Sequence, residues 1–597
     1  MSLLEVRNLR TYINTHSGSI QAVDGISFKI NQGETLCLVG ESGSGKSITA
    51  LSILGLFPQG LVSHPTGEVW WQGSGIEIHT PTTPEAALAA KRLGYAKRAV
   101  SYYRDESEST APVESVDLLQ LTEEQLCHIR GSQISMIFQE PMTSLNPVFT
   151  IGEQIAEALL LHEPELAPNE VEQRVLTVLQ QVQLPNPKER IHAYPHQLSG
   201  GQRQRVMIAM ALICKPRLLI ADEPTTALDV TVQAEILKLM RKLQDDMGMA
   251  MLFITHDFGV VAEMAHQVGV MQQGRMVELG SKEQVLTQPQ HSYTKQLLAA
   301  VPDNLIKQKS VVVEFKPLTP RYPIDLKKAA NEPEPLIQVQ NASVWFPIKK
   351  GLWRHTVDYV KAVDNVSLNI QQGKIVALVG ESGCGKTTLG RAIIQLERVS
   401  AGKILLEGTD LTQLSQSELR KWRPKMQIAF QDPQSSLNPR LLIETTLTEP
   451  MKVHGIGHNQ EERIERAAQI LEQVQLKREY LWRYPHEFSG GQRQRIGLAR
   501  ALVLNPRFIV CDEITSALDV SVQAEILELL LDIRAQQNLT LLFITHNIGV
   551  VEYLSDETVV MYKGQIVEQG VTAQVCGAPK HPYTQTLLAA VPRLKLA

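Results

Sequence analysis

An internal duplication constrains the fold of this 597-residue chain more than any other feature. The heptapeptide SGGQRQR begins at Ser199 and again at Ser489, an offset of 290 (489 − 199). The stretches HSYTKQLLAAVP, from 291, and HPYTQTLLAAVP, from 581, have the same offset. Because self-similarity at a fixed offset indicates one structural unit used more than once, we expect two related domains in tandem.

The offset changes once, and the change locates an insertion in the first copy. Lys46 and Lys386 differ by 340, whereas Gln139 and Gln431 differ by 292, so the first copy carries 48 extra residues between these points (340 − 292). Alignment of GEVWWQG with GKILLEG places the insert at about 74–115. We expect a solvated elaboration with one short helix there. A contact of its basic residues with a partner or with lipid headgroups stays open.

A proline-rich, charged stretch at 303–335 separates the copies. Such a composition favours an extended linker over a packed domain. The predicted domains are therefore 1–302, which ends in the HSYT tail at 291–302, and 336–597, which contains the HPYT tail at 581–592.

Charge, hydropathy and cysteine spacing exclude several classes of protein. The net charge of −5 argues against a dedicated nucleic-acid surface, which usually makes a chain basic. No apolar run reaches the roughly 18 residues that span a bilayer, and MSLLEVRNLR lacks the pattern of a secretory signal. The six cysteines form no CxxC pair, so a zinc or iron–sulfur site is not expected. We expect a cytoplasmic protein that would need partner chains for any work in a membrane.

Two glycine-rich loops indicate phosphate binding. In each copy an apolar run, a G-x-x-x-x-G-K-[ST] loop and a helical pattern follow one another, which is the context of a phosphate loop. Backbone N–H groups and the helix N-terminus would hold phosphate oxygens, the lysine would reach the outer phosphates, and the last hydroxyl would bind Mg²⁺. The predicted loop residues are Gly40, Glu41, Ser42, Gly43, Ser44, Gly45, Lys46 and Ser47, and Gly380, Glu381, Ser382, Gly383, Cys384, Gly385, Lys386 and Thr387.

Acidic pairs and histidines follow further apolar runs. RLLIADE and RFIVCDE each end in two carboxylates, and LFITHD and LFITHN each end near a histidine. We predict that Asp222 and Asp512 hold Mg²⁺ and that Glu223 and Glu513 are general bases toward the attacking water. His256 and His546 are predicted to contact the γ-phosphate as catalytic residues. The alternative for the acidic pairs is a solvated strand end.

The pentapeptides LSGGQ (198–202) and FSGGQ (488–492) complete a set of motifs that resembles the ATP-binding cassette ATPases, because other phosphate-loop families lack them. The resemblance covers nearly the whole chain apart from the insert and the linker. It implies an α/β fold with two tandem P-loop NTPase cassettes. Each cassette would have a RecA-like parallel sheet core, an antiparallel β subdomain and an inserted helical subdomain. ATP and Mg²⁺ are the cofactors that it implies.

The resemblance also implies further roles at the site. Gln139 and Gln431 would sense Mg²⁺ and the γ-phosphate, and ALD segments ending at Asp229 and Asp519 would cross to the opposite copy. The signature residues that would cover the ATP of the other copy are Ser199, Gly200, Gly201 and Gln202, and Ser489, Gly490, Gly491 and Gln492.

Adenine would stack on an aromatic side chain of the first strand in each cassette, again by resemblance. Phe346 is that residue in the second copy. In the first copy Ile13 occupies the aligned position, so we assign the neighbouring Tyr12. Two further departures are Ile514, where the first copy has proline, and Cys384 in place of Ser44. Since the carboxylates remain, we expect both sites to be active.

The tails and the YPH-x-x-SGGQ stretches resemble the peptide-type importer ATPases. The resemblance implies a peripheral protein at the cytoplasmic face of the inner membrane. Its partners would be two integral membrane permease subunits and, indirectly, a solute-binding protein. Both nucleotide sites would form between the two cassettes. Whether the cassettes pair within one chain or between chains stays open, as does the choice among glutathione, a dipeptide and an oligopeptide.

Two soluble classes are alternatives to transport. A tandem cassette protein acting on the ribosome would have a long, charged, helical connector and a basic surface, whereas this chain has a proline-rich linker and is mildly acidic. A DNA-repair cassette would carry zinc-binding cysteine pairs or very long coiled coils. We therefore expect an importer ATPase with no nucleic-acid partner.

Overall fold

The computed structural model describes residues 2–15, 18–58, 60–73, 115–139, 144–226, 228–306, 334–350, 355–432, 436–516 and 518–594. Most of the insert at 74–115 and of the linker at 303–335 lies outside these residues. The chain forms two compact units, which are Met1–Leu228 with Val232–Leu298 and Pro592–Ala597, and Asp229–Thr231 with Ala299–Val591.

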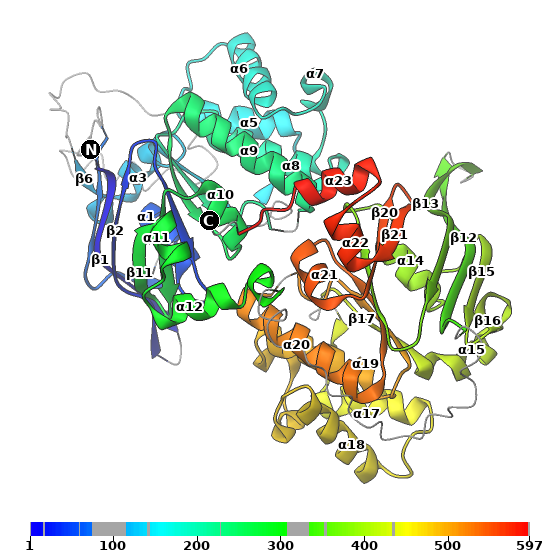
Figure 1. Cartoon of the computed structure of the whole chain (residues 1–597). Helices are drawn as coiled ribbons and strands as arrows, with labels where there is room; N and C mark the ends of the chain where they lie inside the picture. Colours follow the sequence, from blue (N-terminus) through cyan, green and yellow to red (C-terminus); the bar gives the residue numbers. More distant parts are fainter. Residues whose placement is uncertain are drawn as a thin grey trace, which may run out of the picture. The chain divides into compact units, whose positions relative to one another are not determined.

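Each copy contains one antiparallel sheet and one mostly parallel sheet. In the first copy the antiparallel sheet has the order β2-β1-β5-β6, with β4 beside β1, and the other sheet has the order β11-β10-β3-β9-β8-β7 (Figure 1). The strands are β1 (Ser2–Thr15), β2 (Gly18–Asn31), β3 (Thr35–Val39), β4 (Val62–Ser63), β5 (Glu68–Trp71), β6 (Val116–Asp117), β7 (Ile134–Ile137), β8 (Leu218–Asp222), β9 (Ala250–Ile254), β10 (Gln267–Gln272) and β11 (Arg275–Ser281).

The helices of the first copy include α5, α6 and α7, which lie together beside α8 (Figure 1). The described helices are α1 (Lys46–Leu54), η2 (Leu118–Gln120), α3 (Glu123–Ile129), α5 (Ile151–Leu160), α6 (Pro168–Gln181), α7 (Pro187–Arg190), η3 (Pro195–Gln197), α8 (Gly200–Leu212), α9 (Val230–Met247), α10 (Phe258–Met264), α11 (Lys282–Thr287) and α12 (Ser292–Ala299).

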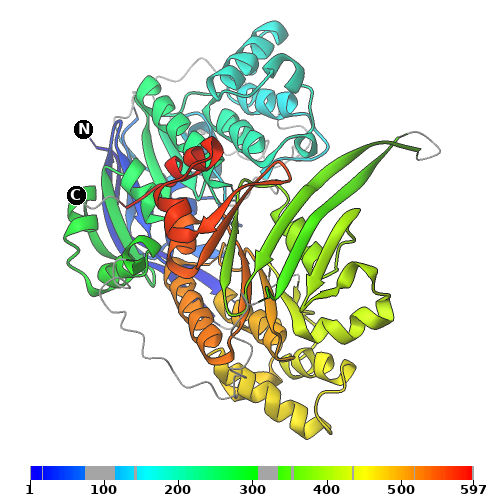
Figure 2. The ribbon, with the colours of Figure 1, turned by 45° about the vertical axis from the view of Figure 1, so that its right-hand side comes forward.

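The second copy repeats these sheets with the orders β13-β12-β15-β16 and β17-β18-β19-β14-β20-β21. Figure 2 shows β12 and β13 extending together as a long two-stranded ribbon. The strands are β12 (Ile337–Lys350), β13 (His355–Ile370), β14 (Ile375–Val379), β15 (Ala401–Leu406), β16 (Thr409–Asp410), β17 (Met426–Ala429), β18 (Phe508–Asp512), β19 (Thr540–Ile544), β20 (Glu557–Tyr562) and β21 (Gln565–Val571).

The helices of the second copy follow the same order, with α17 and α18 beside α19 (Figure 1). They are α14 (Lys386–Ile393), η5 (Leu411–Gln413), α15 (Gln416–Trp422), η6 (Arg423–Lys425), α17 (Ile443–Val453), α18 (Gln460–Gln473), η7 (Arg478–Trp482), η8 (Pro485–Glu487), α19 (Gly490–Leu502), α20 (Val520–Gln537), α21 (Ile548–Leu554), α22 (Thr572–Gly577) and α23 (Pro582–Ala589). The predicted fold class is confirmed.

Strand order brings the motif-bearing strands together in each copy. β9 lies between β3 and β8, and all residues of these three strands are buried. Apolar side chains on both faces suit parallel strands that are covered by other elements on each side. Because parallel strands present their carboxyl ends at one edge, the phosphate loop, the acidic pair and the histidine converge there.

Helix α1 packs into the apolar core that the two sheets of the first copy share. Leu9 of β1, Ile53 of α1 and Ile220 of β8 belong to this core, and each is fully buried. The position of α1 between the sheets fixes the direction in which the phosphate loop leaves β3. None of the described helices is long and apolar enough to cross a membrane.

One residue of the segment between the copies packs against the second copy. The first unit reaches Leu298, and Leu305, which we placed in the linker, lies in the apolar core of the second copy with 7% exposure. The second unit thus begins before residue 336.

Candidate nucleotide sites

The first phosphate loop connects β3 to α1. It passes through Gly40, which has a backbone conformation that only glycine can adopt at this place. Gly40 has φ +151°, and a Cβ on it would lie 2.2 Å from the carbonyl oxygen of Met271. The ammonium of Lys46 is buried and donates to the carbonyl oxygens of Gly40 at 2.7 Å and Glu41 at 2.9 Å. The loop therefore holds the cation that would meet phosphate oxygens.

The second phosphate loop has the same geometry. Lys386 donates to the carbonyl oxygens of Gly380 and Glu381, at 2.8 Å each. Cys384 lies 3.9 Å from the Lys386 ammonium, where Ser44 lies 3.3 Å from Lys46. The Cys384 side chain is only 6% exposed, and burial raises the pKa of its thiol. Burial therefore shields this thiol from reagents in this conformation.

A hydroxyl and a carboxylate meet beside each loop. The Ser47 hydroxyl donates to Asp222 at 3.1 Å, and the Thr387 hydroxyl donates to Asp512 at 2.8 Å. Burial raises the pKa of Asp222, and the bond from Ser47 offsets only part of that effect. Paired oxygen donors are the ligands that Mg²⁺ prefers, so the residues present fit this ion.

The candidate base of the first copy has a strained backbone and a carboxylate with three polar partners. Glu223 has φ +48°, although its N–H still donates to the carbonyl of Ile254 in the neighbouring strand at 2.9 Å. Its carboxylate accepts from Gln139 and Thr226, at 2.9 Å each, and lies 3.2 Å from Nδ1 of His256. Non-glycine residues with positive φ concentrate at functional sites, so the strain supports a role beyond packing.

The second copy builds the same cluster with one difference. Glu513 has φ +47°, accepts from Gln431 at 2.8 Å, and lies 3.7 Å from Nδ1 of His546. Here the Ser516 hydroxyl donates to the backbone carbonyl of Glu513 at 2.9 Å, whereas Thr226 reaches the carboxylate of Glu223. Each copy thus brings its predicted base, glutamine and histidine together.

Both bases are held in the ionised form. Burial raises the pKa of Glu223, but the hydrogen bonds and charge of His256, together with the bond from Thr226, outweigh it and lower this pKa to about 2. Burial also raises the pKa of Glu513, but the hydrogen bond and charge of His546 outweigh it, so this pKa is lowered as well. Each carboxylate is therefore ionised at neutral pH, which the role of a proton acceptor requires.

Each signature motif starts a helix that is exposed at its N-terminus. Ser199 caps α8 by accepting the N–H of Gln202, and Ser489 caps α19 in the same way. Both serines are exposed, and the glycine that follows each serine is exposed too. The free N–H groups at such a helix start form a site for an anion.

The second signature glycine of each copy also has a packing role. A Cβ on Gly201 would lie 2.5 Å from a methyl group of Val232, and one on Gly491 would lie 2.4 Å from a methyl group of Val522. Close approach of the signature helix to the following helix therefore requires glycine.

Comparison with known proteins identifies this set of sites. A family model described as ABC transporter matches residues 23–226 and 363–516, and another, described as oligopeptide/dipeptide transporter, C-terminal region, matches 277–322 and 567–596. The chain belongs to the ABC transporter family.

Relatives extend over nearly the whole length of this ABC ATPase. It is 45% identical over 588 residues to the peptidoglycan transport ATP-binding protein YejF of Agrobacterium fabrum, with 98% of this chain and 96% of that protein covered. It is 44% identical over 601 residues to the glutathione import ATP-binding protein GsiA of Escherichia coli O157:H7, with 99% and 90% covered. The solved dimeric structure of a bacterial ABC transporter cassette is 28% identical and covers 40% of this chain and 98% of that chain, with a TM-score of 0.36. The predicted resemblance to peptide-type and glutathione importer ATPases is confirmed, and the ABC ATPase binds and hydrolyses ATP.

The adenine-stacking residues of this ABC ATPase stay predictions. Tyr12 lies in β1, and its hydroxyl accepts from the Gln21 side chain at 2.9 Å. Phe346 lies in β12 with 40% exposure. Of the two ALD aspartates, Asp229 accepts from Thr231 at 2.7 Å, and Asp519 directly precedes α20.

One contact of the bases was missing from our sequence-based expectations. Thr226 bonds the Glu223 carboxylate, and the signal that could have found it is the paired hydroxyl residues after each acidic pair, TT in DEPTT and TS in DEITS. The residues Ala227 and Ala517 of the ALD segments lie outside the described part of the chain.

Proposed function

We propose that this ABC ATPase is the energy-coupling subunit of an importer for glutathione, a small peptide or a peptide fragment of the cell wall. The observation that carries the proposal is the tail that follows the nucleotide-binding motifs of each copy, because the family model that matches this tail is described as oligopeptide/dipeptide transporter, C-terminal region. The relatives named for glutathione import and peptidoglycan transport support the same substrate class.

Each ATP site is completed, in this proposal, by the other cassette. ATP bound by Lys46, Gln139 and Asp222 of the first cassette would be covered by residues 489–492 of the second. The reciprocal site would use Lys386, Gln431 and Asp512 with residues 199–202. The exposed starts of α8 and α19 support this arrangement, because capped helix N-termini offer N–H groups to an anion.

Hydrolysis follows from the position of the ionised base. Glu223 or Glu513 accepts a proton from water as the water oxygen attacks the γ-phosphorus, the bond from this phosphorus to the bridging oxygen breaks, and ADP leaves. The neighbouring histidine stabilises the charged carboxylate beforehand. The lysine ammonium and the loop N–H groups hold the phosphates in place. Mg²⁺, held by Ser47, Gln139 and Asp222 or by Thr387, Gln431 and Asp512, would neutralise phosphate charge.

Exposed apolar side chains on the first cassette support a docking site for a permease helix. Phe138 follows β7 and is 44% exposed, while Val148 and Phe149 precede α5 and are 70% and 49% exposed. These exposed apolar side chains, which lie on either side of residues 139–147 in the sequence, would give a membrane partner a surface to bind close to Gln139. The equivalent segment of the second cassette would receive a second permease subunit. The chain would then work at the cytoplasmic face of the inner membrane, and a solute-binding protein would deliver the substrate to the permease.

The test is purification of the full chain from membranes in mild detergent. We expect two integral membrane proteins to co-purify, and ATP hydrolysis in the reconstituted complex to rise when the solute-binding protein is loaded with its peptide. Phe149→Ser should weaken co-purification, whereas Ile20→Ser, which changes a 57% exposed side chain of β2, should not. Co-sedimentation with ribosomes and no membrane partner would overturn the proposal.

A further inference from the structure

The C-terminal tail of each copy contacts the phosphate loop of the same copy through one tyrosine hydroxyl. The N–H of Glu41 donates to the hydroxyl oxygen of Tyr293 at 3.2 Å, and the N–H of Glu381 donates to that of Tyr583 at 3.0 Å. These tyrosines are the third residues of HSYT and HPYT. The bond recurs in two copies with different surroundings, since Tyr583 stacks on Tyr562 where the first copy has Gln272.

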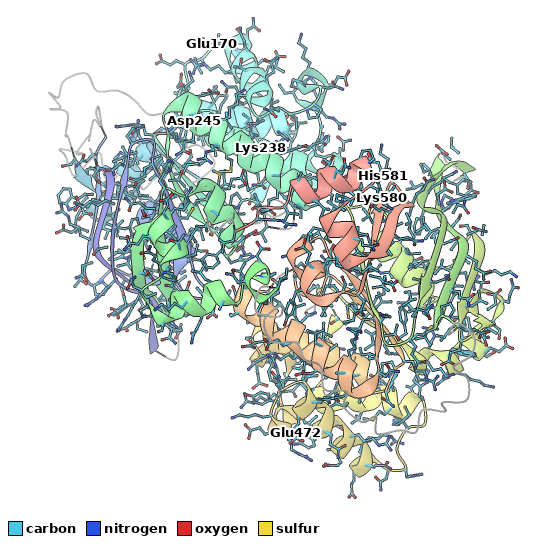
Figure 3. All side chains as sticks on the ribbon, viewed as in Figure 1. Glu170, Lys238, Asp245, Glu472, Lys580 and His581 are labelled. Carbon is cyan, nitrogen blue, oxygen red and sulfur yellow. The ribbon has the colours of Figure 1, made fainter. Side chains whose placement is uncertain are left out.

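A carboxylate on the edge strand anchors the start of each tail helix. Glu278 of β11 accepts the N–H groups of Gln290 at 2.8 Å and His291 at 3.1 Å. In the second copy Glu568 of β21 accepts the corresponding N–H groups at 2.8 Å and 3.0 Å. Figure 3 labels their donors, Lys580 and His581, at the start of α23. The sheet therefore sets the position of the tail relative to the nucleotide site.

The tail histidine fixes the tyrosine. Nδ1 of His291 accepts the N–H of Tyr293 at 3.2 Å, and Nδ1 of His581 accepts the N–H of Tyr583 at the same distance. A side chain that accepts an N–H two residues later caps a helix start and orients its first turn. Burial raises the pKa of Tyr583, so its hydroxyl stays protonated and accepts the loop N–H through a lone pair. Glutamate, histidine and tyrosine thus form a chain of contacts that ends at the loop.

The bond to tyrosine and the bond to lysine belong to one peptide group. The N–H of Glu41 and the carbonyl of Gly40 share a planar peptide, in which they point in opposite directions. Tyr293 holds the N–H side, and Lys46 donates to the carbonyl side at 2.7 Å. The second copy has the same arrangement, with Lys386 2.8 Å from the Gly380 carbonyl oxygen. Fixing one side of the peptide therefore orients the acceptor for the lysine on the other side.

We propose that Tyr293 and Tyr583 are positioning residues for ATP binding, which hold the first peptide of each phosphate loop and, through it, the catalytic lysine. The tail motif then acts within the ATPase itself, whatever substrate is imported. Without the hydroxyl, the loop N–H loses this bond, and the peptide is held less firmly although the lysine still contacts its carbonyl. ATP then has to order the loop when it binds, and this cost lowers the affinity for ATP.

The test measures MgATP binding and steady-state hydrolysis by the full chain with Tyr293→Phe, Tyr583→Phe and both changes. Leaving one N–H unbonded should weaken ATP binding about five- to thirty-fold in each altered site. KM for ATP should rise by a similar factor, whereas kcat at saturating ATP should change less than about two-fold, since the tyrosine touches neither the base nor the attacking water. The matched control is Tyr562→Phe, which removes a hydroxyl from the stacked neighbouring ring and should leave KM unchanged.

A second pair of variants covers the case in which the phenylalanine variants fail to fold. His581→Ala removes the cap of the tyrosine, whereas His581→Asn supplies an oxygen that caps a helix start, so the alanine variant should raise KM more. Unchanged KM and ATP affinity in folded Tyr→Phe variants would overturn the proposal, as would equal KM in the two His581 variants. Either result leaves the import proposal intact, because permease binding and transport are not measured.

Discussion

Replacing the candidate bases by glutamine tests the chemistry of both sites with little change of shape. The Glu223 carboxylate accepts two bonds, from Gln139 and Thr226, and faces Nδ1 of His256. A glutamine at this position can turn its carbonyl oxygen toward Gln139 and Thr226 and donate its amide to an unprotonated Nδ1. The hydrogen bonds survive in that orientation, so Glu223→Gln removes the negative charge and the basicity while the cluster stays bonded.

The expected loss is the contribution of a general base, about 10²- to 10⁴-fold in kcat. ATP affinity should stay within about two-fold of wild type, because the phosphate loop, Lys46 and Asp222 are untouched. The double variant Glu223→Gln with Glu513→Gln should show the full loss. Each single variant reports on the coupling between the two sites. Two independent, equally active sites would leave about half of the wild-type rate of hydrolysis. Sites that must work together would leave a few per cent of that rate or less.

The assay is steady-state phosphate release by the full chain, with nucleotide binding measured by equilibrium titration on the same preparations. Near-normal hydrolysis by the double variant would refute the assignment of both bases. Loss of ATP binding together with hydrolysis would show instead that the carboxylate supports the loop.

Three further predictions concern packing, metal binding and pH. Gly491→Ala should lower the free energy of unfolding by about 1–3 kcal/mol, because the added methyl would lie 2.4 Å from a methyl group of Val522; Gly490→Ala, which meets nothing within 4 Å, is the control for thermal melting. Asp222→Asn should raise the Mg²⁺ concentration needed for half-maximal hydrolysis at least about ten-fold, and an unchanged Mg²⁺ titration would contradict its role. The lowered pKa of Glu223 adds stability that is present above the ordinary pKa of 4.5 and is lost as the pH falls toward about 2. The free energy of unfolding of wild type, measured in urea, should therefore fall by about 1.4 kcal/mol more than that of Glu223→Gln between about pH 6 and about pH 3.5. If the difference between the two free energies stays constant over this range, the result is inconsistent with the shift.

Short motifs next to buried strands were predictable from the sequence, because each combines local composition with a local backbone requirement. The glycine loop before Lys46 follows β3, and the acidic pair stands at the carboxyl end of β8; all residues of both strands are buried. Such a run of apolar residues predicts a buried parallel strand, and polar site residues commonly lie at the carboxyl end of such a strand. Because the sequence is duplicated, the same elements could be predicted for the second copy.

The contacts among these motifs depend on strand order and were decided by the tertiary structure. Gln139 reaches Glu223 across 84 residues, and the Tyr293 hydroxyl reaches the N–H of Glu41 across 252 residues. No local pattern states that β9 lies between β3 and β8, or that the tail helix returns to the phosphate loop.

The sequence by itself predicted two nucleotide sites, and it predicted which loops, carboxylates and histidines belong to each. Those assignments need only the residue types that phosphate and metal chemistry demand at a strand end. The tertiary structure decided how each base is bonded and kept ionised, and that the tail tyrosine holds the loop. These properties arise from groups that burial forces together, since a buried N–H or carboxylate has to find its partner wherever the fold provides one.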